Sequence, residues 1–167
     1  MSIDVLNESG TDHDEAALSR LARFVLEAMR IHPQAELCVK LVDEATIATM
    51  NERWMDAEGP TDVLAFPMDE LRPGHDDDDL PDGVVGDVVL CPQVAAAQAA
   101  SRGHSVRHET DLLVIHGILH LLGYDHAGPQ EEREMFGLQE RLLAQWERRP
   151  QGEGGRHGAA VYRSGGA

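Results

Sequence analysis

The chain has 167 residues, 42% apolar and 26% charged, which is typical of a globular protein with a sizeable core. Fourteen basic against thirty acidic residues give a net charge of −16, which disfavours charge-driven binding of nucleic acid. Any nucleic-acid role must therefore depend on a local site. The two cysteines are too few for a disulfide scaffold, and no apolar run approaches the roughly 20 residues of a membrane helix. The polar, acidic start is not typical of an export signal, so we expect a cytoplasmic protein without membrane contact.

The first half of the chain predicts alternating strands and helices. In chain order these are a strand around Ile3 and Val5, a helix from about Thr11 that ends before Pro33, a strand over Glu36–Val42, a helix over Asp43–Trp54 and a strand over Val63–Phe66. Thr11 or Asp12 is expected to cap the first helix, and Asp43 the second, because these side chains accept hydrogen bonds from the first turn of a helix.

The second half begins with an acidic segment, Met68–Asp82, which is predicted to be a solvated loop or hairpin tip. A strand over Gly86–Cys91 and helices over Pro92–Arg102, Val106–Leu122 and Gln130–Arg148 are predicted to follow. Residues 150–167 are glycine-rich and are expected to be a disordered tail, which leaves residues 1–149 as a single domain. The predicted class is α+β, with a small mixed β-sheet packed against about five helices.

Three histidines form the pattern that most strongly indicates chemistry, in the segment HGILHLLGYDH (residues 116–126). His116 and His120 are one helical turn apart and about 40° apart around the axis, so both rings can reach one ion. Gly123 can end the helix in the left-handed conformation, and the chain then turns back to bring His126 to the same ion. Three imidazoles with an open fourth position are the ligand set of a catalytic zinc site. The pattern predicts a zincin-like metal site.

The spacing HxxxHxxGxxH also occurs in metzincin proteases, which carry a glutamate directly after the first histidine as general base. Gly117 occupies that position here, which weighs against a metalloprotease. Two carboxylates are candidate catalytic groups. Glu109, two turns before His116, is either an acceptor for an imidazole N–H or an ordinary acid of the first helical turn. Asp125 either plays the same part or stabilises the turn.

Together with segments elsewhere in the chain, this motif resembles the YbeY family of bacterial rRNA maturation factors, which are metal-dependent endoribonucleases. The matching segments, in family order, are Met50-Asn51 with Trp54, GPTDVLAFP (59–67), Gly86-Asp87, Glu109 and the histidine motif. The resemblance extends roughly from Ile3 to Trp146. It implies a small mixed sheet packed with helices and one zinc ion per chain beside a cleft. The implied zinc ligands are His116, His120 and His126.

The resemblance also implies a substrate and partners. The activity would be cleavage of single-stranded rRNA in maturation of the small-subunit 3′ end and in ribosome quality control, with the small subunit and its proteins as partners. Family members often carry an arginine, implicated in RNA handling, where this chain has Met55. Arg53 lies about 200° away around a helix and is no automatic substitute.

Two other functions stay open. One is a non-catalytic ribosome-assembly factor stabilised by zinc, which the acidic surface favours because ribosomal proteins are basic. The other is the metalloprotease that Gly117 weighs against.

Overall fold

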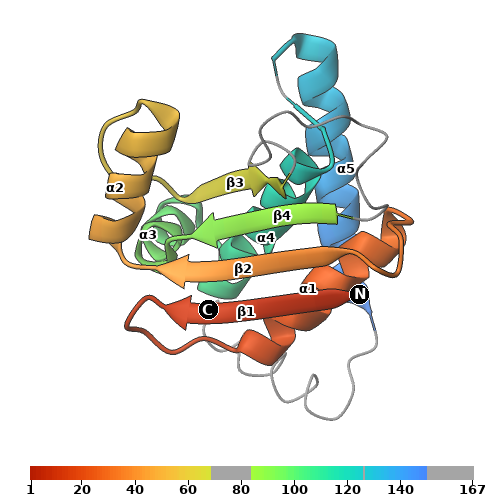
Figure 1. Ribbon diagram of the computed structural model, residues 1–167, viewed down its shortest axis with the longest axis horizontal. Helices are drawn as coiled ribbons and strands as arrows, with labels where there is room; N and C mark the ends of the chain where they lie inside the picture. Colours follow the sequence, from red (N-terminus) through yellow and green to blue (C-terminus); the bar gives the residue numbers. More distant parts are fainter. Residues whose placement is uncertain (69–83, 126, 150–167) are drawn as a thin grey trace.

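The computed structural model describes residues 1–68, 84–125 and 127–149 (Figure 1). In chain order, its elements are β1 (Ser2–Glu8), α1 (Glu15–Ala28), β2 (Glu36–Val42), α2 (Glu44–Met55), β3 (Val63–Pro67), β4 (Val84–Leu90), α3 (Pro92–Arg102), α4 (Val106–Leu121) and α5 (Pro129–Arg148). The predicted α+β class is confirmed, with four strands and five helices among the described residues. Nearly all of the predicted acidic loop, the predicted tail at 150–167 and His126 lie outside the described residues.

The four strands form one mixed sheet in the order β1-β2-β4-β3 (Figure 1). Strands β1, β2 and β4 are parallel, and β3 pairs antiparallel with β4. In the register, Val39 of β2 and Ala65 of β3 both pair with Val88 of β4. Strand β3 is therefore an edge strand of the sheet, and it contacts helix α4.

Helix α4 is the central helix of the core. It packs against β3 and β4, while α1, α3 and α5 contact its other sides (Figure 1). Side chains around its circumference are buried, including Val114, Ile115, Ile118 and Leu119. A helix that is apolar on nearly every side must be enclosed, which explains its place at the centre. Across the described residues, none of the helices combines the length and apolar character needed to cross a bilayer.

The helix starts were predicted with unequal success. Helix α2 begins as expected, because the Asp43 carboxylate accepts the Thr46 N–H at 2.8 Å. The prediction for α1 was wrong. Its N-cap is Asp14, whose carboxylate accepts the Ala17 N–H at 2.9 Å, rather than Thr11 or Asp12.

The reason for the later start of α1 lies in the turn before it. The side chain of Asn7 donates to the Thr11 carbonyl at 2.7 Å, and the Ser9 hydroxyl accepts the Thr11 N–H at 3.2 Å. The Thr11 hydroxyl lies 2.7 Å from a ring nitrogen of His13. These local bonds hold Thr11 in a turn, so the first helical residue is Glu15.

A buried ion pair lies where α5 covers the first half of α4. The Arg107 Nε atom lies 2.9 Å from Asp111 Oδ1 and donates to Oδ2 at 3.0 Å. Burial raises the pKa of the Asp111 carboxyl to about 6, against the lowering effects of Arg107 and of a hydrogen bond from Trp146. At neutral pH, keeping Asp111 ionised in the folded protein therefore lowers the free energy of unfolding.

Replacement of Asp111 by asparagine should change how stability depends on pH. The Asp111 pKa is higher in the folded protein than in the unfolded chain, so its stabilising contribution is complete below the unfolded value of about 3.9 and is lost as pH rises through about 6. The total is on the order of 3 kcal/mol. From pH 4 to pH 7, the free energy of unfolding of wild type, measured in urea, should fall relative to that of Asp111→Asn by most of this amount. A wild-type minus variant difference that is constant with pH would contradict the assignment.

Candidate metal centre

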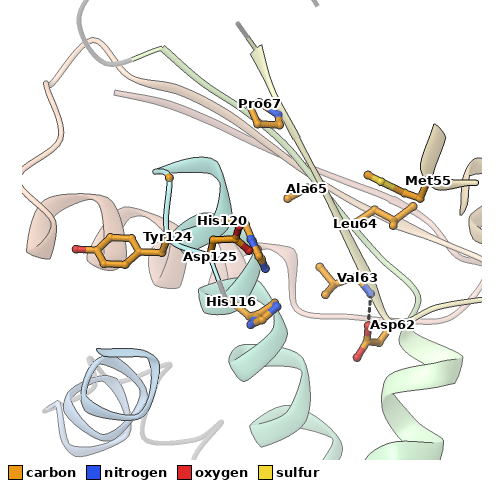
Figure 2. A pocket seen from close by; sticks show the side chains of 12 residues that line it. Met55, Asp62, Val63, Leu64, Ala65, Pro67, His116, His120, Tyr124 and Asp125 are labelled. Carbon is orange, nitrogen blue, oxygen red and sulfur yellow. Dashed lines mark hydrogen bonds between the residues drawn. The ribbon is translucent and has the colours of Figure 1, made fainter. Parts of the chain in front are cut away.

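A cavity of about 560 Å³ lies between the second half of α4 and strand β3 (Figure 2). Its lining residues are Met55, Asp62, Val63, Leu64, Ala65, Pro67, His116, Gly117, His120, Gly123, Tyr124 and Asp125. The two histidines form the helix wall and face the side chains of β3 across the space, as Figure 2 shows. The cavity thus contains two of the three predicted metal ligands.

Gly117 lets α4 approach the sheet closely. A Cβ atom at this position would lie 2.7 Å from Val88 Cγ1, 3.1 Å from Val88 Cγ2 and 3.4 Å from Val63 Cγ2. The first distance is shorter than carbon atoms tolerate, so a side chain here would push the helix away from β4. A glutamate, the general base of metzincins, does not fit without such a shift. The packing therefore adds a physical reason to the sequence argument against a metalloprotease.

The turn after α4 brings further groups to the cavity. Gly123 has a φ of 100°, and its N–H donates to the His120 carbonyl at 3.1 Å, while the Tyr124 N–H donates to the Leu119 carbonyl at 3.0 Å. These two bonds form the Schellman motif that ends many helices. The helix stop predicted at Gly123 is confirmed. The chain turns back there, and Tyr124 and Asp125 join the lining.

His116 and His120 lie side by side, with ring centroids 4.7 Å apart and ring planes at 78°. The predicted third ligand, His126, is outside the described residues, so the complete three-histidine prediction stays a prediction. Within residues 1–68, 84–125 and 127–149, no three His, Cys, Asp or Glu side chains are arranged to hold a metal ion. The described part of the site is a pair of imidazoles that fits two positions of a metal's coordination shell.

The orientation of the His116 ring is fixed by helix α5. Nδ1 of His116 lies 2.8 Å from Oε1 of Gln139, and the ring of Phe136 stacks on the imidazole at 6.3 Å and 17°. An amide oxygen only accepts, so this contact favours the neutral His116 tautomer that has its proton on Nδ1 and its lone pair on Nε2. A neutral imidazole with one nitrogen engaged in this way is the usual form of a histidine metal ligand. The chemistry of this pair therefore fits a metal ion.

Gln139 is a site residue that the sequence analysis missed. It is 7% exposed and lies on the buried stripe of α5, where the positions before and after it, Met135, Leu142 and Trp146, are apolar. A polar residue in the middle of an apolar stripe indicates a buried hydrogen-bond partner. That signal was present in the sequence, but the pattern could not identify His116 as the partner.

The two candidate carboxylates lie in different surroundings. Asp125 is exposed on the cavity wall beside His120 (Figure 2). Glu109 is completely buried at the start of α4, and both of its carboxylate oxygens accept from Arg102 Nη1 at 3.0 Å. Among the described residues that line the cavity, Glu109 is absent. The contacts of Glu109 are thus those of an ion pair that joins α3 to α4.

A protein-family model described as "Endoribonuclease YbeY" matches residues 4–147. The chain belongs to the YbeY family. The YbeY proteins most similar in sequence include one from Nocardioides sp., 63% identical over 149 residues that cover 89% of this chain and all of the relative, and one from Thermobifida fusca, 63% identical over 148 residues that cover 89% and 96%. Both are named "Endoribonuclease YbeY". The resemblance inferred from the motifs is confirmed.

A solved structure supports the same fold for this YbeY family member. The solution structure of a Thermotoga maritima protein, 28% identical in sequence, aligns with a TM-score of 0.58 over 86% of this chain and 88% of that one. The mixed sheet and its helices are therefore shared with a protein of known structure.

Gly117→Ala should destabilise the protein by about 1–3 kcal/mol, because the added methyl group overlaps Val88. The double variant with Gly117→Ala and Val88→Ala lacks both overlapped atoms. Its loss in free energy of unfolding should therefore be smaller than the sum of the losses in the two single variants. Gly137→Ala in α5 is the matched control, since no atom lies within 4 Å of its added Cβ, and it should stabilise the helix by up to about 1 kcal/mol. Urea unfolding measures all four variants. Strict additivity of Gly117→Ala and Val88→Ala would contradict the packing argument.

Gln139→Leu should weaken metal binding about 10- to 100-fold, because the His116 ring loses the acceptor that fixes its tautomer and direction. Gln139→Glu keeps an acceptor at the same place and should retain binding. Competition with a chromophoric chelator measures the affinity, and circular dichroism checks that each variant is folded. Equal affinity of Gln139→Leu and wild type would show that the hydrogen bond does not orient a ligand.

Proposed function

We propose that this protein is a zinc-dependent endoribonuclease that cleaves single-stranded rRNA. The observation that carries the proposal is the pair His116 and His120, adjacent on the wall of a cavity, in a member of the YbeY family. The names of its relatives support the endoribonuclease role. One zinc ion per chain is proposed, with His116, His120 and His126 as ligands.

The donor set supports zinc. Neutral imidazoles are preferred ligands of zinc, and three of them leave a coordination position for substrate. When bound, the ion supplies Lewis acidity toward a phosphate oxygen. The bond between Gln139 and His116 holds the lone pair on Nε2, so this ligand needs no reorientation before the ion binds.

Asp125 is the proposed proton acceptor. The cavity lining has two described carboxylates, Asp62 and Asp125, and Asp62 accepts the Val63 N–H at 2.7 Å at the start of β3. Asp125 is exposed on the turn beside His120, where it can take a proton from an attacking hydroxyl or water. Gly117 supplies no side chain at the position of the metzincin base, so that position provides no general base.

The acidic surface supports a substrate presented within a ribosomal particle. A net charge of −16 opposes the approach of free RNA, whereas basic ribosomal proteins attract such a surface. We infer that the substrate is the 3′ end of small-subunit precursor rRNA in the cytoplasm, together with rRNA removed in ribosome quality control. The partners are then the small subunit and its proteins.

His120→Ala should lower both the zinc content and the cleavage of RNA, from about one zinc per chain to near zero and by at least about 100-fold in rate. The substrates are a single-stranded oligonucleotide from the 3′ end of precursor rRNA and the precursor small subunit. His32→Ala is the matched control, because His32 is exposed on the loop before β2. Elemental analysis, gel assays and circular dichroism provide the three measurements.

Two outcomes would overturn the enzyme proposal. Full cleavage by folded, zinc-free His120→Ala would show that the reaction does not need the metal. Normal rRNA processing in cells that carry folded His120→Ala would favour the non-catalytic assembly factor instead.

A further inference from the structure

One exposed large apolar side chain of the described residues, Met55, lines the cavity, and its neighbour in the sequence, Trp54, is more exposed still. Five such side chains are at least about one third exposed: Leu6, Trp54, Met55, Val106 and Phe136. Met55 lines the cavity, Trp54 precedes it in α2, and Phe136 stacks on His116.

Trp54 is the most exposed of the five, at 59%. The guanidinium of Arg53 lies over its ring, 5.7 Å from the centroid. The segment that carries it is held in place, because α2 ends at Asp56 and the side chain of Asn51 donates to the Gly59 carbonyl at 3.0 Å. The ring is therefore exposed to solvent at the end of α2, one residue before Met55 of the cavity lining.

The charges nearby indicate which part of a nucleotide the ring would contact. Glu52, Asp56 and Glu58 line a hollow of about 690 Å³ at the same end of α2. Three carboxylates repel phosphate, and Arg53 is the basic residue of the last turn of this helix. A nucleobase is uncharged and stacks on aromatic rings whatever its sequence. The surroundings of Trp54 thus favour a base over the sugar–phosphate backbone.

We propose that Trp54, backed by Arg53 and adjoining Met55, stacks against an unpaired base of RNA whose neighbouring phosphate lies in the cavity. This inference rests on the proposed endoribonuclease function and deepens it. A base within a duplex is already stacked on its neighbours, so this surface selects single strands. Stacking also supplies affinity that does not depend on positive charge, which suits a chain with a net charge of −16.

The chain provides its own reporter for this contact. It has two tryptophans, Trp54 at 59% exposure and Trp146 at 6%, so quenching of tryptophan fluorescence by a stacked base reports Trp54. The probe is a single-stranded 2′-O-methyl oligoadenylate of twelve nucleotides, chosen because methylation slows cleavage, added to the zinc-loaded full chain. We expect quenching on binding. Trp54→Phe should abolish the quenching and keep affinity within a few-fold, whereas Trp54→Ala should weaken binding about tenfold or more.

Leu6→Ala is the matched control. Leu6 is 44% exposed on β1, at the opposite edge of the sheet from β3, and its loss should leave affinity unchanged. The loss in Trp54→Ala should be nearly independent of salt, because stacking is not a charge interaction. Quenching that persists in Trp54→Phe, or binding by Trp54→Ala within twofold of wild type, would overturn the inference.

A cleavage assay on unmodified single-stranded RNA separates this inference from the proposed function. Wild type that cleaves RNA while Trp54→Ala binds and cleaves equally well would refute the stacking surface alone. Wild type that binds and quenches as expected without any cleavage would support the surface and refute the nuclease.

Discussion

The close approach of α4 to strand β4 is the constraint on which the candidate site depends. It exists because Gly117 has no side chain where Val88 occupies the space. His116 lies one residue before this contact and His120 three residues after it, so the depth at which the helix packs sets the distance of both imidazoles from β3. A helix held farther out would widen the cavity and move both rings together. The same glycine stands where metzincins carry the glutamate that acts as general base, so the residue that allows close packing also leaves that position without a carboxylate.

Helix α5 also determines how the ring of His116 is oriented. Gln139 and Phe136 hold the ring of His116 from the side away from β3, one through a hydrogen bond and the other through stacking. Further along α5, Trp146 hydrogen-bonds Asp111, and Glu147 lies 2.7 Å from a ring nitrogen of His108. The α4–α5 interface therefore contains polar pairs along its length among largely apolar neighbours. The two buried pairs, Gln139 with His116 and Trp146 with Asp111, favour one register between the helices, because a shift would leave buried polar groups without partners.

Features governed by nearby residues could be predicted from the sequence. The Asp43 cap, the stop at Gly123 and the common face of His116 and His120 each follow from residues within one or two helical turns. The start of α1 was missed because Asn7 and Ser9 compete for the backbone of Thr11 through side-chain bonds that propensity rules do not include. The partners of Glu109 and His116 could not be predicted, because Arg102 and Gln139 come from other helices and only tertiary packing brings them close.

The Gln139–His116 bond also sets the order in which the site can form. The ring is oriented only when residues from α5, the last described helix of the chain, have packed against α4. During translation α5 is synthesised after every other described element, so the imidazole pair lacks this support until α5 has been made and has packed. For a protein proposed to cut rRNA, the ribosome that synthesises it also contains RNA of the proposed substrate class. The orientation of His116 is therefore completed only when the last described helix has packed.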